Sequence, residues 1–286
     1  LDKVTRMVRV PLMLDSTDER VVESALTYCQ GKAIINSVNL ENGLERFEKI
    51  CPLARRYGAA LVVGCIDEDK TNAMAVTRER KLAVAERSHE ILTRDFGIPE
   101  EDIYFDPLVF PCGTGDAKFK GSARETIEGV RLIKARFPRA KTILGISNVS
   151  FGLPPEGREV LNAVFLHENV VAGLDLAIVN SEKLERYAAI PEDEKALCLA
   201  LIDSGSDTAI AAFAAYFRQR TPKAGVAPRA LLPLDERLAR AIVDGTKEGL
   251  IDDLNEKLIS TRPLEIINGP LMAGMDEVGR LFNANQ

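Results

Sequence analysis

Tryptophan is absent from the 286-residue sequence, and the two histidines are His89 and His167. Neither histidine belongs to an H-E-x-x-H motif, and both lie in stretches with helical patterning, which argues against a histidine metal site or a histidine general base. The five cysteines are odd in number and no two of them form a C-x-x-C pair. This spacing argues against a zinc knuckle and against a disulfide framework. We therefore predict no metal site in this chain.

The sequence also lacks an excess of basic residues and long apolar runs. Its 37 lysines and arginines stand against 43 acidic residues, for a net charge of −6, which removes the electrostatic basis for binding a phosphate backbone. No apolar run approaches the ~18 residues of a membrane span, and the N-terminal segment has no apolar signal core. We therefore expect a cytoplasmic protein that binds neither nucleic acid nor a membrane.

What the sequence does contain is a repeated alternation of short apolar, β-branched runs with longer helical stretches. The predicted strands are residues 8–14, 32–38, 59–66, 103–110, 141–147 and 174–180. The predicted helices between them are residues 17–29, 41–58, 72–97, 123–137 and 156–173. Continuous apolar strands separated by crossover helices indicate a parallel sheet that is covered on both faces.

An Asp or Asn stands near the end of each predicted strand. These residues are Asp15, Asn36, Asp67, Asp106, Asn148 and Asn180. In a (β/α)8 barrel such positions surround one mouth, at the carboxyl ends of the strands. The alternative for any one of them is that it caps the helix that follows, and acidic first turns make this most plausible for Asp15 and Asp67.

The fold class that we predict is α/β, a TIM barrel followed by a partial helical bundle. Six β/α units do not close an eight-stranded barrel, and the chain begins with Leu1 rather than methionine, so we expect it to begin partway through the barrel. A six-stranded doubly wound sheet is the alternative, but the G-x-G-x-x-G turn expected after its first strand is missing.

After Asn180 the alternation stops. Residues 192–220 predict two helices that close the barrel domain, residues 1–220. Residues 221–233 contain three prolines and are predicted to be an interdomain linker. Residues 234–286 have apolar side chains at helical spacing and predict two or three helices, whose core is too small to be stable alone.

Carboxylates and carboxamides with few neighbouring histidines, lysines or cysteines suit recognition of a polar heterocycle better than hydrolysis. A pterin fits this description, because its pyrimidine edge presents an amino group and a ring N–H side by side. One buried carboxylate can accept both donors as a fork, and Asp106 is our candidate. Asparagines complement the rest of such a ring, because each carboxamide both donates and accepts.

Several segments resemble the pterin-binding barrel of the cobalamin-dependent methionine synthases. They are VPLMLDST, GKAIINSVNLENG, RRYGAALVVGCIDE, EDIYFDPLVFP, LGISNVSFGLP and LDLAIVN. The tail STRPLEIINGPLMAGMDEVGRLF is similar to the first half of the helical cap that precedes the cobalamin domain in that family. The resemblance covers nearly the whole chain and implies that the first two β/α units of the barrel are lacking. It also implies that residues 234–286 form the first half of the cobalamin cap.

The activity that the resemblance implies is binding of 5-methyltetrahydrofolate and transfer of its methyl group to cobalamin in the Co(I) state, within the conversion of homocysteine to methionine. Asp15, Asn36 and Asp106 match residues that hold the pterin, and Asn148 matches the asparagine near the pterin N5. Among the other residues of the LGISNVSFGLP segment, Ser147 is expected to contact the substrate and, together with Ser150, to organise a water.

The resemblance has two further implications for side chains. Asn180, at the last strand end, is expected to bind the substrate. Phe282 matches the cap phenylalanine that covers the methyl-bearing face of the corrin, where an apolar lid excludes water. For the two serines that flank Asn148, the alternative is a simple role in a turn.

Other parts of the family pattern are missing from the sequence. There is no D-x-H-x-x-G segment to bind cobalt and no cysteine cluster for the zinc that activates homocysteine. We therefore expect cobalamin to be bound mainly by a domain absent from this chain, and zinc to belong to an absent homocysteine domain. Those domains and the small-molecule folate are the expected partners.

Three alternatives remain open from the sequence. Dihydropteroate synthase uses a similar barrel, but that family places a lysine where Asn148 stands and lacks the helical tail. A corrinoid-dependent methyltetrahydrofolate methyltransferase keeps the asparagine, but its corrinoid normally lies on another polypeptide. The third alternative is a non-catalytic fragment that docks a partner through the apolar face of its helical tail.

Overall fold

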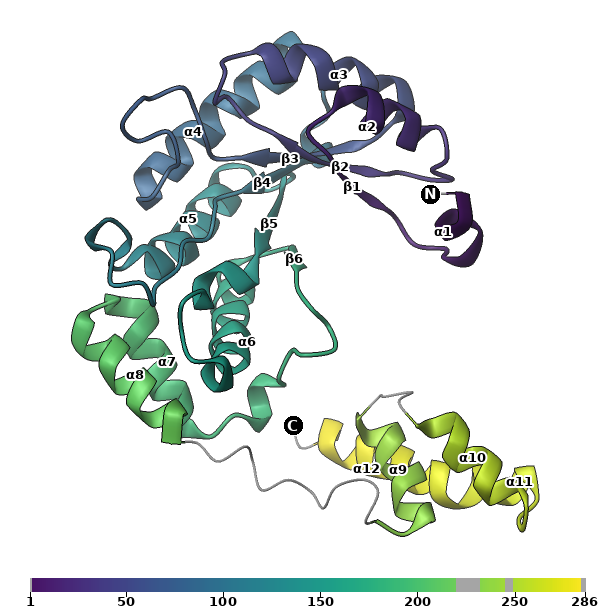
Figure 1. Cartoon of the computed structure of the whole chain (residues 1–286). Helices are drawn as coiled ribbons and strands as arrows, with labels where there is room; N and C mark the ends of the chain where they lie inside the picture. Colours follow the sequence, from purple (N-terminus) through teal and green to yellow (C-terminus); the bar gives the residue numbers. More distant parts are fainter. Residues whose placement is uncertain (1, 220–231, 245–248, 284–286) are drawn as a thin grey trace. The chain divides into compact units, whose positions relative to one another are not determined.

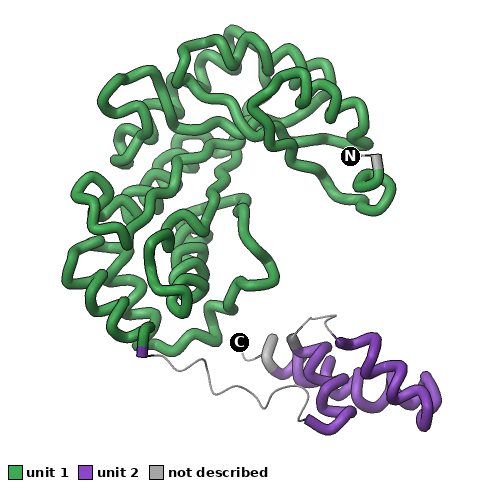
Figure 2. Tube along the Cα trace, viewed as in Figure 1, with its two compact units in different colours: residues 1–218 green, residues 219–286 purple. Residues whose placement is uncertain are grey.

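The computed structural model describes residues 2–219, 232–244 and 249–283. The chain divides into two compact units, residues 1–218 and residues 219–286 (Figure 2). Most of the predicted linker, residues 221–233, lies outside the described residues. Each unit is described by itself below.

The first unit is built on a parallel sheet whose strands are neighbours in the order of the sequence (Figure 1). The strands are β1 (Met13–Asp15), β2 (Ile34–Val38), β3 (Ala60–Gly64), β4 (Ile103–Asp106), β5 (Lys141–Gly145) and β6 (Leu176–Ile178). Every neighbouring pair is parallel. Sequential parallel strands joined by helices are the arrangement of a TIM barrel, so the predicted α/β fold is confirmed.

Helices precede, connect and follow these strands. They are α1 (Asp2–Met7), α2 (Glu19–Leu26), α3 (Glu45–Tyr57), α4 (Arg78–Glu90), α5 (Ser122–Arg136), α6 (Pro155–Ala172), α7 (Glu192–Ser204) and α8 (Asp207–Gln219). Short helical turns add η1 (Ile91–Asp95), η2 (Glu100–Asp102), η3 (Ala117–Phe119), η4 (Ile146–Ser150) and η5 (Tyr187–Ala189). The two helices predicted for residues 192–220 correspond to α7 and α8.

Two predicted strands are shorter in the structure, β1 at its start and β4 at its end. The prediction of a strand over residues 8–14 was wrong in most of its length, because β1 begins at Met13 and Pro11 cannot donate a ladder hydrogen bond. The strand predicted over residues 103–110 stops at Asp106. Pro107 has no N–H to donate, and Leu108 has a φ of 67°, which no strand accommodates.

The core of the first unit fixes which way each strand residue points. Leu14, Ile35 and Phe105 belong to one buried apolar cluster with side chains of α2, α3, α4 and α5. Side chains alternate between the two faces of a strand. The residues that follow these three, Asp15, Asn36 and Asp106, therefore lie on the opposite, inner face of the sheet. The helices cover the outer face (Figure 1).

The second unit is a small group of helices. They are α9 (Leu234–Asp244), α10 (Leu250–Leu258), α11 (Pro263–Ile266) and α12 (Met272–Asn283), with the π-helical turn η7 (Ile267–Leu271) between the last two. This is more than the two or three helices predicted, because Pro270 and η7 interrupt one long apolar pattern. Leu238, Ala241 and Ile266 are buried. In the described parts of the chain, no helix combines the length and the apolar character needed to cross a membrane.

We expect Gly157→Ala to destabilise the first unit. A Cβ at Gly157 would stand 2.7 Å from ring atoms of Phe213 and 2.8 Å from Phe217, both fully buried. Overpacking of this kind costs about 1–3 kcal/mol, more than the gain of up to ~1 kcal/mol in helix propensity. Urea unfolding measures the loss.

Gly31→Ala is the matched control, because a Cβ there has nothing within 4 Å. Its free energy of unfolding should stay within about 0.5 kcal/mol of the parent. Equal unfolding midpoints for the two variants would contradict the close packing of α6 on α8.

Candidate functional site

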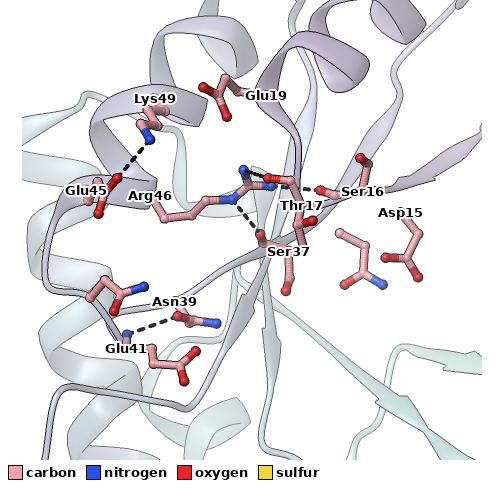
Figure 3. Close-up of a pocket in the computed structure, with 12 residues that line it drawn as sticks. Asp15, Ser16, Thr17, Glu19, Ser37, Asn39, Glu41, Glu45, Arg46 and Lys49 are labelled. Carbon is pink, nitrogen blue, oxygen red and sulfur yellow. Dashed lines mark hydrogen bonds and ion pairs between the residues drawn. The ribbon is translucent and has the colours of Figure 1, made fainter.

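The carboxyl ends of β1 and β2 bring two of the predicted site residues together. Asp15 and Asn36 are register partners across the two strands. Both line a cleft of about 330 Å³ beneath the loops that follow β1 and β2 (Figure 3). The other lining residues are Ser16, Thr17, Glu19, Ser37, Asn39, Glu41, Asn42, Glu45, Arg46 and Lys49. In the described part of the chain, neither the Asp15 carboxylate nor the Asn36 carboxamide has a hydrogen-bond partner, so both are available to a ligand.

Arg46, in the first turn of α3, holds the two loops of this cleft. Its guanidinium donates to the carbonyl oxygens of Ser16 at 2.8 Å, Thr17 at 2.8 Å and Ser37 at 3.3 Å (Figure 3). One planar cation therefore joins the segment after Asp15 to the segment after Asn36. Arg46 was not among the residues predicted from the sequence, although a cation in the first turn of a helix opposes the helix dipole and is a signal of a local role.

Asp106 ends β4 on the same inner face, and its carboxylate is set in a tight turn. Its register partner on β3 is Gly64, so no side chain stands beside it there. The backbone N–H of Leu108 donates to Asp106 Oδ1 at 2.9 Å. Burial raises the pKa of the Asp106 carboxyl to about 6. In the described part of the chain, the second carboxylate oxygen has no hydrogen-bond donor, so the carboxylate keeps capacity for further donors.

Ser147 and Asn148 lie on η4, directly after β5, and both side chains are exposed. Hydrogen bonds of the buried Ser150 side chain hold the turn that carries them. Ser150 is fully buried, and its hydroxyl donates to the Ser147 carbonyl at 3.1 Å and accepts from Arg158 Nε at 3.3 Å. Ser150 thus fits the turn alternative, whereas the Asn148 carboxamide, among described residues, has no hydrogen-bond partner.

Three further predicted residues are Asn180, Asp67 and Phe282. The Asn180 side chain is exposed, and its Oδ1 accepts from the Glu182 N–H at 3.1 Å in a local turn. Asp67 is buried and accepts from the Arg80 guanidinium, so it does not belong to a free polar ring. Phe282 falls within α12, but its side chain lies outside the described residues.

The capping alternative is wrong for the strand-end residues. Asp18, not Asp15, caps α2, and its carboxylate accepts from the Arg20 N–H at 2.9 Å. Thr77, not Asp67, caps α4. The N-cap positions of α3, α5 and α6 are Leu44, Gly121 and Pro154. Asp15, Asn36, Asp106 and Asn148 are therefore not needed to begin a helix.

Thiol and metal chemistry find no support at this face. Cys65 and Cys112 are buried near the strand ends, and burial raises the pKa of each thiol to about 12. Such thiols are not nucleophiles at neutral pH. The described ranges contain no group of three or more His, Cys, Asp or Glu side chains that could hold a metal ion.

Two parts of the chain match known protein families. Residues 1–180 match the pterin-binding enzymes, and residues 234–286 match the B12-binding domain family. The first match covers more than half of the chain, so the chain belongs to the family of pterin-binding enzymes.

Two individual proteins resemble the chain over nearly its whole length. The chain is 40% identical over 287 aligned residues to the methionine synthase of Mycobacterium tuberculosis and likewise to that of Mycobacterium leprae. Each alignment covers 97% of this chain and 24% of the relative, so the chain spans about a quarter of their length. The resemblance to methionine synthases is confirmed.

We expect Arg46→Met to loosen the loops around Asp15 and Asn36. The substitution removes three hydrogen bonds from a charged donor, which should lower the free energy of unfolding by about 1–3 kcal/mol. Hydrogen–deuterium exchange should speed up in peptides that cover residues 15–19 and 36–42.

Lys49→Met is the matched control, because Lys49 lines the same cleft but pairs with Glu45 on the surface of the same helix. It should leave exchange in both loops unchanged. Equal exchange rates in the two variants would show that Arg46 does not hold the loops.

Proposed function

We propose that this chain binds 5-methyltetrahydrofolate on the inner face of its sheet and presents the methyl group to Co(I) cobalamin, as a part of a methionine synthase that makes methionine from homocysteine. The observation that carries the proposal is the placement of Asp15, Asn36 and Asp106 on one face. None of the three caps a helix or forms an ion pair with a neighbour in the described structure. The match of residues 1–180 to the pterin-binding enzymes supports a pterin as the ligand of that face.

Asp106 is the residue that we assign to the pyrimidine edge of the pterin. The edge offers an amino group and a ring N–H, and an ionised carboxylate accepts both. The Leu108 N–H orients the carboxylate from one side, and Gly64 leaves the register position beside Asp106 on β3 without a side chain. Burial makes each such hydrogen bond stronger than it would be in water.

Asp15 on β1 and Asn36 on β2 would complete the recognition from the other side of β3. The carboxylate accepts only, whereas the carboxamide both donates and accepts, so the pair complements the mixed pattern of a reduced pterin. Ser147 and Asn180 would add contacts from the strand ends beyond Asp106. Residues 1–220 form the barrel domain in this proposal, with residues 221–233 as the linker.

Asn148 would act at the pterin N5. A tertiary amine leaves poorly unless its nitrogen is protonated, since the departing nitrogen would otherwise carry negative charge. A neutral carboxamide without other partners can turn its oxygen toward an N–H that forms as the reaction proceeds. Stabilising that species more than the ground state raises the rate.

Residues 234–286 would form the first half of a cobalamin cap. Exposed apolar side chains on α12 fit this assignment, with Met272 and Met275 about half exposed at 45% and 50%. When bound, cobalamin in the Co(I) state supplies the nucleophile that accepts the methyl group. Phe282 is the residue that we assign to the lid over the corrin, where an apolar surface excludes water.

Titration of the chain with 5-methyltetrahydrofolate, followed by calorimetry, tests the proposal. Saturable binding is expected. Asp106→Asn should weaken it by about 1.5–3 kcal/mol, or roughly 10- to 150-fold, because the charged fork of hydrogen bonds is lost. An absence of saturable binding would favour a non-catalytic docking role for the chain.

Binding should also depend on pH. The pKa of Asp106 is raised to about 6, so affinity should be full above that pH and fall as the pH is lowered through it, because a protonated carboxyl cannot accept both donors. Asp106→Asn should lose this dependence. A wild-type affinity that stays constant between pH 5 and 7 would contradict the role of Asp106.

Asn148→Ala should affect rate more than binding. Transfer of the methyl group to exogenous Co(I) cobalamin is expected to slow by about 10²–10³-fold, as for loss of one transition-state donor or acceptor. Folate affinity should change by less than about tenfold. Losses of equal size in rate and in affinity would show that Asn148 only binds the ground state.

A further inference from the structure

Lys81, on α4, is a buried cation that the proposed function does not use. It is fully buried. Its ammonium donates to the carbonyl oxygens of Ala75 at 2.9 Å, Pro107 at 2.5 Å and Leu108 at 3.3 Å. Among the described residues, no carboxylate lies within ion-pair distance of Lys81. Burial of a cation without a direct counter-ion costs several kcal/mol, so its place beneath β4 requires an explanation.

The contacts of Lys81 converge on the turn that follows Asp106. Two of its three acceptors belong to Pro107 and Leu108. Leu108 has the left-handed φ of 67°, which is costly for a branched side chain and persists where surrounding contacts hold it. The N–H of this same residue orients the Asp106 carboxylate. Lys81 therefore supports the one backbone conformation that places a donor on Asp106.

The helix α5 is shaped to admit the Lys81 stem. A Cβ at Gly129 would stand 2.7 Å from Lys81 Cδ. Thr126, one turn earlier on α5, donates its hydroxyl to the Leu108 carbonyl at 2.9 Å. The turn thus has two side-chain donors, of which one carries a charge and the other does not.

The charge of Lys81 has a direct effect on Asp106. The ionisable groups that face Lys81 are Cys65 directly after β3, Asp106 on β4 and Glu125 on α5. Glu125 is itself paired with Arg78. Burial lowers the pKa of Lys81 to about 8, whereas the carboxylates of Asp106 and Glu125 oppose the decrease. In turn, the Lys81 charge lowers the pKa of Asp106 against the larger effect of burial.

We propose that Lys81 is a positioning residue for pterin recognition, which holds the Asp106 turn in shape and keeps the Asp106 carboxylate ionised at neutral pH. The inference rests on the proposed function for its biological meaning. Its physical content, the coupling of Lys81 to Asp106, can be measured without any ligand.

The experiment is a pH titration of the chain labelled with ¹³C at the aspartate carboxyl carbons, followed by NMR. The Asp106 signal is assigned by its loss in Asp106→Asn. In Lys81→Met the midpoint of this signal should rise by about one pH unit or more, because an opposite charge is removed. Folate affinity should then fall at pH 7 and recover at higher pH.

Thr126→Val is the matched control, because it removes the uncharged donor to the same Leu108 carbonyl. It should loosen the turn but leave the Asp106 midpoint within about 0.3 pH units, well below the effect of a lost charge. Equal midpoints in Lys81→Met and Thr126→Val would overturn the inference. If Lys81→Met does not fold, Gly129→Ala decides, because it displaces the ammonium without removing it and should also raise the midpoint.

The two proposals fail separately. Wild-type protein that binds 5-methyltetrahydrofolate, with no shift of the Asp106 midpoint in Lys81→Met or Gly129→Ala, would refute the role of Lys81 alone. A shifted midpoint in protein that never binds the folate would refute the proposed function and leave the electrostatic coupling intact.

Discussion

The parallel pairing of neighbouring strands is the constraint on which the site depends. Because every strand runs the same way, the carboxyl ends of β1 to β6 meet along one edge, and residues separated by 133 positions, from Asp15 to Asn148, belong to one region of the fold. The helices bury the outer face, which leaves the inner face as the place for polar side chains. Asp15, Asn36 and Asp106 occupy it without an ion-pair partner in the described structure.

The alternation of strands and helices could be predicted from the sequence, because short apolar, β-branched runs recur between longer stretches with helical spacing. The errors have local causes. Pro11 stands within an apolar run that is not a strand, and Pro107 with Leu108 ends β4 early. The capping alternative for Asp15 failed because the N-cap of α2 is Asp18, three residues later, in a segment rich in possible caps.

The strand-end residues of the site could be predicted because their carboxylate and carboxamide side chains are visible in the sequence and would themselves contact a ligand. Arg46 and Lys81 could not, because their partners are backbone carbonyls far away in the sequence. A carbonyl group is the same in every residue, so nothing in the letters at positions 16, 17 or 107 marks it as an acceptor. Lys81 stands in a charged stretch whose pattern is typical of a solvated helix face, and only the packing against Gly129 shows that it is buried.

Because Arg46 bonds only to backbone carbonyl oxygens of the two loops, the side chains of those loops can change while the cleft keeps its shape. Hydrogen bonds to main-chain oxygens do not depend on which side chains the loop residues carry. Ser16, Thr17 and Ser37 can be exchanged without loss of the anchor, so new contacts to a ligand can be introduced at these rim positions while the scaffold keeps its shape. The shape of the cleft thus depends on one guanidinium, whereas its ligand selectivity can change through the side chains at these three positions.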